Sequence, residues 1–188
     1  MSERIYRFSE DSRLLGEYLS KMEGSGSILE IGVGGGGNLS KLELLRKFDR
    51  IVGTDLINLA LIRKELPRSV ELVVADKASC FRADTFDIVA FNPPYLPSES
   101  IEDRATDGGR GGVEVPLQFL NSALSVLKIG GRIVLLLSSD DSLEDLEQFC
   151  EERNLSLAKV AESALFFEWL FVFLITRKSR IVSSCALN

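Results

Sequence analysis

The chain contains no histidine among its 188 residues. This absence excludes histidine bases, histidine-ligated metal sites and Ser-His-Asp triads. Cysteine is scarce as well: Cys80, Cys150 and Cys185 are odd in number, far apart, and match neither a zinc spacing nor a disulfide framework. We therefore expect no metal site, and we expect a reducing compartment.

Long hydrophobic runs and an excess of positive charge are also missing. The most apolar run, 164–175, contains Glu168 and is shorter than the roughly 20 residues that span a bilayer. The charged start, 1–4, does not match a signal peptide. The net charge is -6 and the pI about 4.9, which disfavours a stand-alone nucleic-acid binder. A cytoplasmic protein with no membrane contact follows, and a protein substrate or a basic partner remains open.

What is present is a globular composition, with 45% hydrophobic and 27% charged residues, in a length that fits one domain, 1–188. Strand-like runs cover 28–31, 51–55, 70–75, 86–91, 132–137, 155–161 and 166–176. Helical patterns cover 9–22, 39–48, 56–66, 115–127 and 140–153, and the tail 177–188 is expected to be frayed. Alternating strands and helices predict an α/β fold with a seven-stranded, mostly parallel sheet, helices on both faces and an antiparallel C-terminal hairpin. Ligands of such sheets bind at the carboxyl ends of the strands.

The first strand opens into a glycine-rich turn, 32–37. Gly32, Gly34 and Gly37 fit the G-x-G-x-x-G dinucleotide pattern, so the glycines alone do not identify the ligand. Glu30, at the strand end, favours S-adenosylmethionine, because it would accept from the ammonium group of that cofactor and repel a pyrophosphate. The alternative is a plain flexible turn. The cofactor contacts expected here are Glu30, Gly32, Gly34 and Gly36.

Carboxylates also follow the next two strands. Asp55 ends the second strand, roughly 20 residues beyond the glycine turn, where a ribose-binding carboxylate belongs, although it could also cap the helix that starts at Leu56. Asp76, followed by Lys77, would accept from the adenine amino group; the alternative is a solvated loop carboxylate. Asn38 is expected to cap the helix 39–48. We therefore add Asp55, Leu56, Asp76 and Lys77 to the expected cofactor contacts.

The tetrapeptide Asn92-Pro93-Pro94-Tyr95 follows the fourth strand, 86–91. Prolines fix φ and carry no N–H, so the turn is stiff and its carbonyls stay available. Asn92 Oδ1 and the Pro93 carbonyl would accept both hydrogens of a planar NH₂ group, and Tyr95 would pack against its face. These four residues are the catalytic candidates for methyl transfer to nitrogen, with Asn92 also near the cofactor. The alternative is a proline-stiffened turn with no guest.

Two further segments flank this site. The residues 6–12 read, on their own, as a helix start with Ser9 as N-cap. A long, glycine-rich loop covers 93–112, and its end, Asp107 to Gly112, is expected to be a mobile loop able to cover the site; the alternative is a simple disordered loop.

Taken together, these segments resemble the HemK-like glutamine methyltransferases, a class I, Rossmann-like family that depends on S-adenosylmethionine. The resemblance covers nearly the whole chain, and its motifs are Tyr6 to Ser12, the Glu30 turn, Asp55, Asp76, Asn92 to Tyr95 and Gly108 to Glu114. It implies methylation of the glutamine of the Gly-Gly-Gln motif in peptide release factors, with Ser12 against the cofactor and 1–24 covering it. The short archaeal and eukaryotic branch, which the chain resembles most, implies a small zinc-binding activator on the edge strand Ser69–Ala75.

Two other functions compete with this one. Asn-Pro-Pro-Tyr also occurs in adenine N6-methyltransferases of DNA and RNA, but the only basic cluster is 177–180. A methyltransferase-like scaffold that binds cofactor without catalysis is the other alternative, against which the intact Asn92 turn argues.

Overall fold

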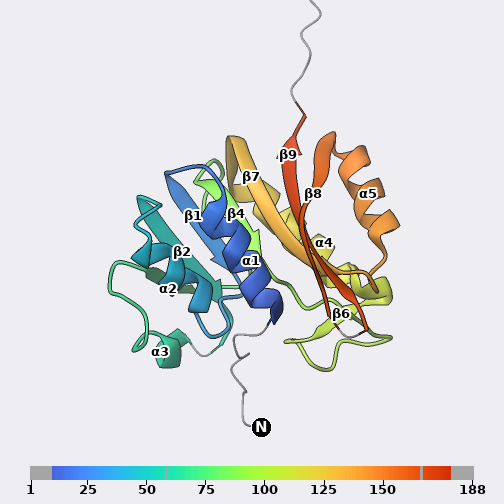
Figure 1. Cartoon of the computed structure of the whole chain (residues 1–188), viewed down its shortest axis with the longest axis horizontal. Coiled ribbons are helices and arrows are strands. Elements are labelled where there is room, and N and C mark those ends of the chain that lie inside the picture. Colours follow the sequence, from blue (N-terminus) through green and yellow to red (C-terminus); the bar gives the residue numbers. More distant parts are fainter. Residues whose placement is uncertain (1–9, 58, 166, 179–188) are drawn as a thin grey trace, which may run out of the picture.

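The computed structural model describes residues 10–57, 59–165 and 167–178 and contains a single large sheet with helices on both faces (Figure 1). Its strands are β1 (Ser27–Ile31), β2 (Arg50–Asp55), β3 (Glu71–Val74), β4 (Phe86–Phe91), β7 (Leu127–Ser138), β8 (Leu155–Ala164) and β9 (Trp169–Arg177). Their order is β3-β2-β1-β4-β7-β9-β8, and β9 runs antiparallel to both of its neighbours. The predicted seven-stranded sheet with an antiparallel C-terminal hairpin is confirmed. The predicted frayed tail lies mostly outside the described residues.

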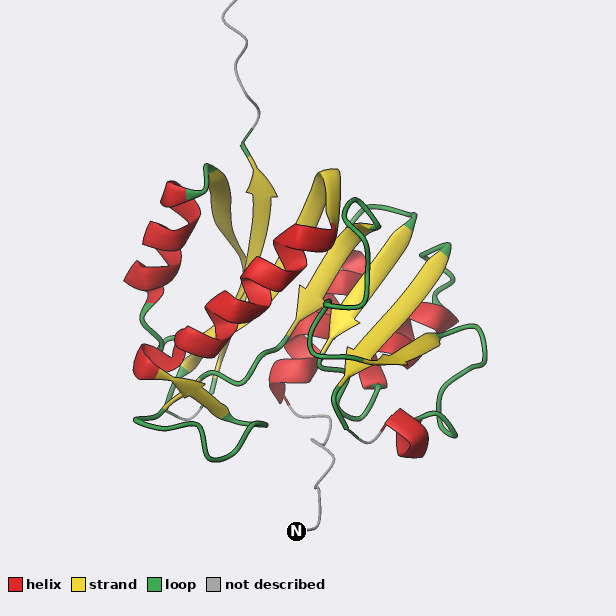
Figure 2. Ribbon diagram, turned by 180° about the vertical axis from the view of Figure 1, so that it is seen from behind, coloured by secondary structure: helices red, strands yellow, loops and turns green. Residues whose placement is uncertain are grey.

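The helices divide between the two faces of the sheet. They are α1 (Glu10–Lys21), α2 (Gly37–Leu44), α3 (Leu59–Ile62), α4 (Glu114–Val126) and α5 (Leu143–Glu152). The first three cover one face, and α4 and α5 cover the other, which is nearer the viewer in Figure 2. The sheet is therefore the middle of three layers.

Strand β4 shows why the central strands carry continuous apolar runs. Ile88 and Ala90 pack in the core beneath α1 and α2, whereas Val89 and Phe91 pack in the core beneath α4 and α5. All four side chains are fully buried. Successive residues of a strand point to opposite faces, so a strand covered on both sides must be apolar at every position.

The predicted helices 39–48 and 56–66 differ from the observed ones. The expectation that Asn38 caps a helix is wrong, because α2 starts at Gly37 with Gly36 as its N-cap. The Asn38 side chain is instead turned inward, where it is hydrogen-bonded to a buried carboxylate. Helix α3 ends at Ile62, and Arg63 donates to backbone carbonyls beyond it, which holds the following residues in turns.

Strand β3 forms one edge of the sheet, as predicted. Its side chains are half-buried or exposed, and Val74 is 70% exposed. Among the described residues, no helix has the length and apolar character needed to cross a membrane.

A polar cluster fastens the amino end of the sheet, remote from the carboxyl ends. The Asp87 carboxylate accepts from the Ser27 backbone N–H at 2.8 Å, the Ser27 hydroxyl at 2.7 Å and Lys128 Nζ at 2.8 Å. Burial raises the pKa of Asp87, but the bonds from Lys128 and Ser27 outweigh this and hold the pKa at about 2. Asp87 therefore ties β1 to β4 and β7 as a carboxylate.

Replacing Asp87 with alanine should lower the free energy of unfolding by about 1–3 kcal/mol, because the buried Ser27 N–H loses its acceptor. Urea unfolding followed by the fluorescence of Trp169, the single tryptophan, measures this loss. Lys128→Ala is the matched control and should cost less than about 1 kcal/mol, since its ion pair is partly exposed. Equal losses in the two variants would contradict the assignment.

Candidate active site

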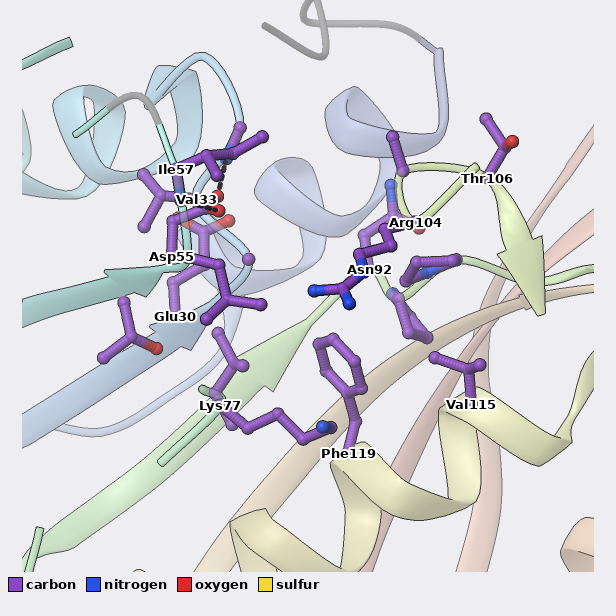
Figure 3. Close-up of a pocket in the computed structure, with 18 of the residues that line it drawn as sticks. Glu30, Val33, Asp55, Ile57, Lys77, Asn92, Arg104, Thr106, Val115 and Phe119 are labelled. Carbon is purple, nitrogen blue, oxygen red and sulfur yellow. Dashed lines mark hydrogen bonds between the residues drawn. The ribbon is translucent and has the colours of Figure 1, made fainter. Parts of the chain in front are cut away.

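A cavity of about 730 Å³ opens where β1, β2, β3 and β4 end (Figure 3). All of the residues expected at the cofactor and the reacting group line this cavity. They are Ser12, Glu30, Gly32, Gly34, Gly36, Asp55, Leu56, Asp76, Lys77, Asn92, Pro93, Pro94 and Tyr95. The structure thus brings the predicted site residues together, whereas their individual roles stay predictions.

The glycine turn after β1 has a backbone that side chains would not allow. Gly32 has φ 77° and its N–H donates to the Thr54 carbonyl at 2.8 Å. Gly34 has φ 52°, and its N–H donates to Asp55 Oδ2 at 3.1 Å. Left-handed backbone angles of this kind favour glycine. The turn therefore lies against the end of β2 and leaves its surface open to a ligand.

Glu30 is a buried carboxylate that is only half satisfied. Its Oε1 accepts from Asn38 Nδ2 at 2.9 Å, and both side chains are no more than 5% exposed. Its Oε2 has no hydrogen-bond partner among the described residues. Burial raises the pKa of Glu30 to about 7, although the Asn38 bond lowers it. An ammonium group in the cavity would supply the missing donor, so the site fits a ligand that carries one.

The carboxylates after β2 and β3 lie at the next positions along the cavity. Asp55 Oδ1 accepts from the Ile57 N–H at 3.3 Å, so Asp55 fixes its own turn as well as the glycine turn. A carboxylate has about four acceptor positions, which leaves capacity for ligand hydroxyls. Asp76 is 2.8 Å from Lys77 Nζ, and that ammonium lies 5.5 Å from the centre of the Phe119 ring.

The Asn92 turn carries another of the unsatisfied polar atoms in this cavity, which among the described residues also include Asn38 Oδ1 and Thr54 Oγ1. Asn92 Oδ1 is buried and has no hydrogen-bond partner among the described residues. The Tyr95 hydroxyl donates to Asp11 Oδ2 at 3.3 Å, and Asp11 is only 4% exposed. This bond ties the turn to the start of α1. A planar NH₂ group has the donors that Asn92 Oδ1 lacks.

Several lining residues were not predicted from the sequence. Val115 and Phe119 reach the cavity from α4, and Arg104 reaches it from the loop after Tyr95 (Figure 3). Val115 and Phe119 are four residues apart and therefore lie on one face of α4. That spacing was the sequence signal by which the two could have been predicted to act together. Arg104 had no such signal, because a loop side chain is aimed by tertiary structure.

Ionisation of Glu30 should make the protein less stable as the pH rises. The pKa is about 7 in the folded chain and near 4.5 unfolded, so the unfolded state loses its proton first. The stabilisation is complete below pH 4.5 and is lost as the pH rises to 7, by about 3 kcal/mol. Urea unfolding at several pH values should show this decline relative to Glu30→Gln, which does not titrate. Parallel curves for the two proteins would contradict it.

Comparisons with known proteins identify relatives of the chain. No family model matches the chain. A Methanocaldococcus jannaschii protein named as a protein N5-glutamine methyltransferase is 33% identical over 150 residues, which cover 72% of this chain and 73% of the relative. The release factor glutamine methyltransferase of Caulobacter vibrioides is 30% identical over 134 residues, which cover 62% of this chain but 46% of that relative.

Solved structures of low identity show the fold. The Mtq2-Trm112 complex of E. cuniculi matches with a TM-score of 0.76 at 24% identity, over 92% of this chain and 98% of that one. A ribosomal protein L11 methylase of Lactobacillus delbrueckii matches with a TM-score of 0.61 at 14% identity. The match covers 89% of this chain and 80% of that one. The predicted Rossmann-like, class I methyltransferase fold is therefore confirmed. With the M. jannaschii relative covered over most of its length, the chain belongs to the HemK-like family of protein N5-glutamine methyltransferases.

Proposed function

We propose that this enzyme transfers a methyl group from S-adenosylmethionine to the glutamine of the Gly-Gly-Gln motif in a peptide chain release factor. The observation that carries the proposal is the buried Asn92 Oδ1, which lies in the same cavity as Glu30 Oε2; neither atom has a hydrogen-bond partner within the part of the chain that the structure describes. The C. vibrioides relative is named for release factors, and the E. cuniculi complex is described as responsible for methylating the termination factor eRF1. This substrate implies a cytoplasmic enzyme.

The half of the cavity at β1, β2 and β3 suits the cofactor. When bound, S-adenosylmethionine supplies a methyl group that is already activated as a sulfonium. Glu30 Oε2 accepts from the ammonium of its amino-acid part, and the open backbone of the glycine turn allows close approach. Asp55 accepts from the ribose hydroxyls, and Asp76 from the adenine amino group. Ser12, Leu56 and Lys77 complete the walls of this half.

The half of the cavity at β4 suits the acceptor amide. An amide nitrogen is a poor nucleophile, because its lone pair is delocalised into the carbonyl. Asn92 Oδ1 and the Pro93 carbonyl accept its two hydrogens and aim the lone pair at the methyl group. As the N–CH₃ bond forms, the S–CH₃ bond of the sulfonium would break and leave a neutral thioether, and the amide would lose one proton to solvent. The nitrogen becomes more positive in the transition state, so these fixed dipoles stabilise that state more than the ground state. Pro94 and Tyr95 hold the amide plane, and the bond to Asp11 fixes the tyrosine ring.

Incubation of the enzyme with labelled S-adenosylmethionine, release factor and RNA should label the release factor alone. Replacing the glutamine of its Gly-Gly-Gln motif with asparagine should abolish the label, since the shorter amide does not reach the methyl group. Mass spectrometry of the labelled peptide identifies the residue. Label in RNA and none in the release factor would rule out this proposal in favour of adenine methylation.

Asn92→Ala is the matched enzyme variant for this assay. It should lower kcat by about 10²–10³-fold, the usual effect of removing one transition-state hydrogen bond, while cofactor affinity changes little. Unchanged transfer by this variant would show that the turn does not act on the acceptor. Lost cofactor binding would move Asn92 to the cofactor half of the site.

We further propose that a small zinc-binding activator covers the edge strand at Ser69–Ala75. An edge strand presents unpaired N–H and C=O groups, and the exposed Val74 adds apolar surface there. The related E. cuniculi structure is a complex of two proteins. Pairing of the partner with β3 would extend the sheet and remove the exposed edge.

Val74→Lys should abolish co-purification with a co-expressed zinc-binding activator, because a lysine on the edge opposes strand pairing. Ile129→Lys is the control, since Ile129 is 92% exposed at the amino end of β7, an inner strand that β2, β1 and β4 separate from β3. Size-exclusion chromatography of both co-expressed pairs gives the result. A lone chain that is monodisperse and fully active would count against the activator.

A further inference from the structure

The acceptor half of the cavity is bordered on one side by a flap, residues 96–109, that has its own hydrogen-bonded structure. Within it β5 (Leu96–Pro97) pairs with β6 (Asp107–Gly109). The Leu96 N–H donates to the Thr106 carbonyl at 2.9 Å, and the Ser98 N–H donates to the Gly109 carbonyl at 3.0 Å. The flap is therefore an ordered element and contributes residues to the cavity wall.

Two carboxylates fix the tip of the flap. Asp107 Oδ2 accepts from the backbone N–H groups of Asp103 at 2.8 Å and Glu102 at 2.9 Å, and these bonds lower the pKa of Asp107. Asp103 Oδ1 accepts from the Ala105 N–H at 2.9 Å. Arg104 thus lies in a stretch of backbone that is held on both sides. Its side chain points into the cavity between Asn92 and Phe119 (Figure 3).

The two cations among the described lining residues differ in their partners. Lys77 is paired with Asp76 at 2.8 Å. No hydrogen bond or ion pair of the Arg104 guanidinium is found within residues 10–57, 59–165 and 167–178. Arg104 is an exposed residue, so the five N–H donors of its guanidinium meet water and are available to a ligand in the acceptor half.

A glutamine amide bound to the Asn92 turn has one group still unsatisfied. Its NH₂ group is taken by Asn92 Oδ1 and the Pro93 carbonyl, which leaves the amide oxygen in need of a donor. A buried carbonyl without a partner loses free energy, whereas a bond from a charged donor is among the stronger hydrogen bonds. Arg104 is placed to provide that donor.

We propose that Arg104 is a specificity-determining residue, which donates to the side-chain oxygen of the acceptor glutamine and disfavours lysine as an acceptor. The inference rests on the proposed function. A lysine side chain has no oxygen for the guanidinium, and its ammonium form is repelled by it. An amide is neutral and satisfies both Arg104 and Asn92.

The Arg104 bond acts mainly on substrate binding. As the amide nitrogen attacks, its lone pair is drawn toward the methyl group and the amide oxygen becomes less negative. The bond from Arg104 is therefore at least as strong in the bound substrate as in the transition state. Removing it should raise KM and leave kcat nearly unchanged, unlike Asn92→Ala, which lowers kcat.

The test is steady-state methylation of a release factor and of the same protein with lysine in place of the motif glutamine. For Arg104→Ala we expect KM for the release factor to rise about tenfold or more with kcat within twofold, as for loss of one charge-assisted hydrogen bond. The ratio of kcat/KM for lysine over glutamine should rise by a similar factor. Arg104→Lys should recover part of the KM effect, and cofactor affinity should stay within twofold.

Arg82→Ala is the control for loss of one exposed positive charge outside the cavity and should change neither KM nor selectivity. Thermal unfolding of each variant checks that it is folded. If Arg104→Ala does not fold, Arg104→Gln replaces it, because glutamine keeps two donors without the charge.

If the wild-type enzyme labels the release factor and Arg104→Ala shows the wild-type KM and selectivity, the role of Arg104 is overturned and the proposed function stands. Weakened cofactor binding would also overturn it, by assigning Arg104 to the cofactor. If the wild-type enzyme does not label the release factor, the proposed function falls and this assignment falls with it.

Discussion

The buried hydrogen bond between Glu30 and Asn38 is the interaction on which the cofactor half of the site depends. It joins the end of β1 to the first turn of α2 across 2.9 Å. Helix α1 packs directly on it, since a Cβ on Gly16 would lie 2.1 Å from Asn38 Oδ1. A half-satisfied carboxylate in this place disfavours its own charged form, as its raised pKa shows. Such a group is expected where a cationic ligand supplies the missing partner.

The acceptor half depends on a different constraint, a turn that leaves acceptors unused. Strand β4 is buried on both faces up to Phe91. Pro93 and Pro94 have no backbone N–H to donate to a neighbouring strand, so the strand ends before them. The bond from Tyr95 to Asp11 ties this turn to α1, the helix that also packs on Asn38. One helix therefore supports both halves of the cavity, which explains why the segment before β1 belongs to the site motif.

Secondary structure was predicted best from the sequence where a single physical signal dominates. Strand β4 was predicted at its observed bounds, because a buried strand followed by two prolines leaves no alternative. Asn38 was predicted to be a helix N-cap because asparagine is typical of that position. In the fold its side chain lies next to the buried Glu30 carboxylate and donates to it instead. The flap was predicted only as part of a glycine-rich loop whose end, 107–112, could cover the site. Its internal structure was missed, because the Asp107 side chain accepts from backbone N–H groups four and five residues away. Contacts of this kind do not produce the regular spacing of hydrophobic residues from which helices and strands are predicted.

The chemistry of the acceptor explains why the two halves present opposite kinds of group. In the proposed complex, carboxylates in the cofactor half would face a ligand with a net positive charge. In the proposed reaction, neutral carbonyl dipoles in the acceptor half would face the nitrogen that becomes positive, whereas a full negative charge there would bind ammonium groups more tightly than amides. An arginine beside those dipoles adds a donor for oxygen and a charge that opposes amines. The proposed selection of an amide over an amine would thus need both groups, because the Asn92 turn alone would recognise only the nitrogen.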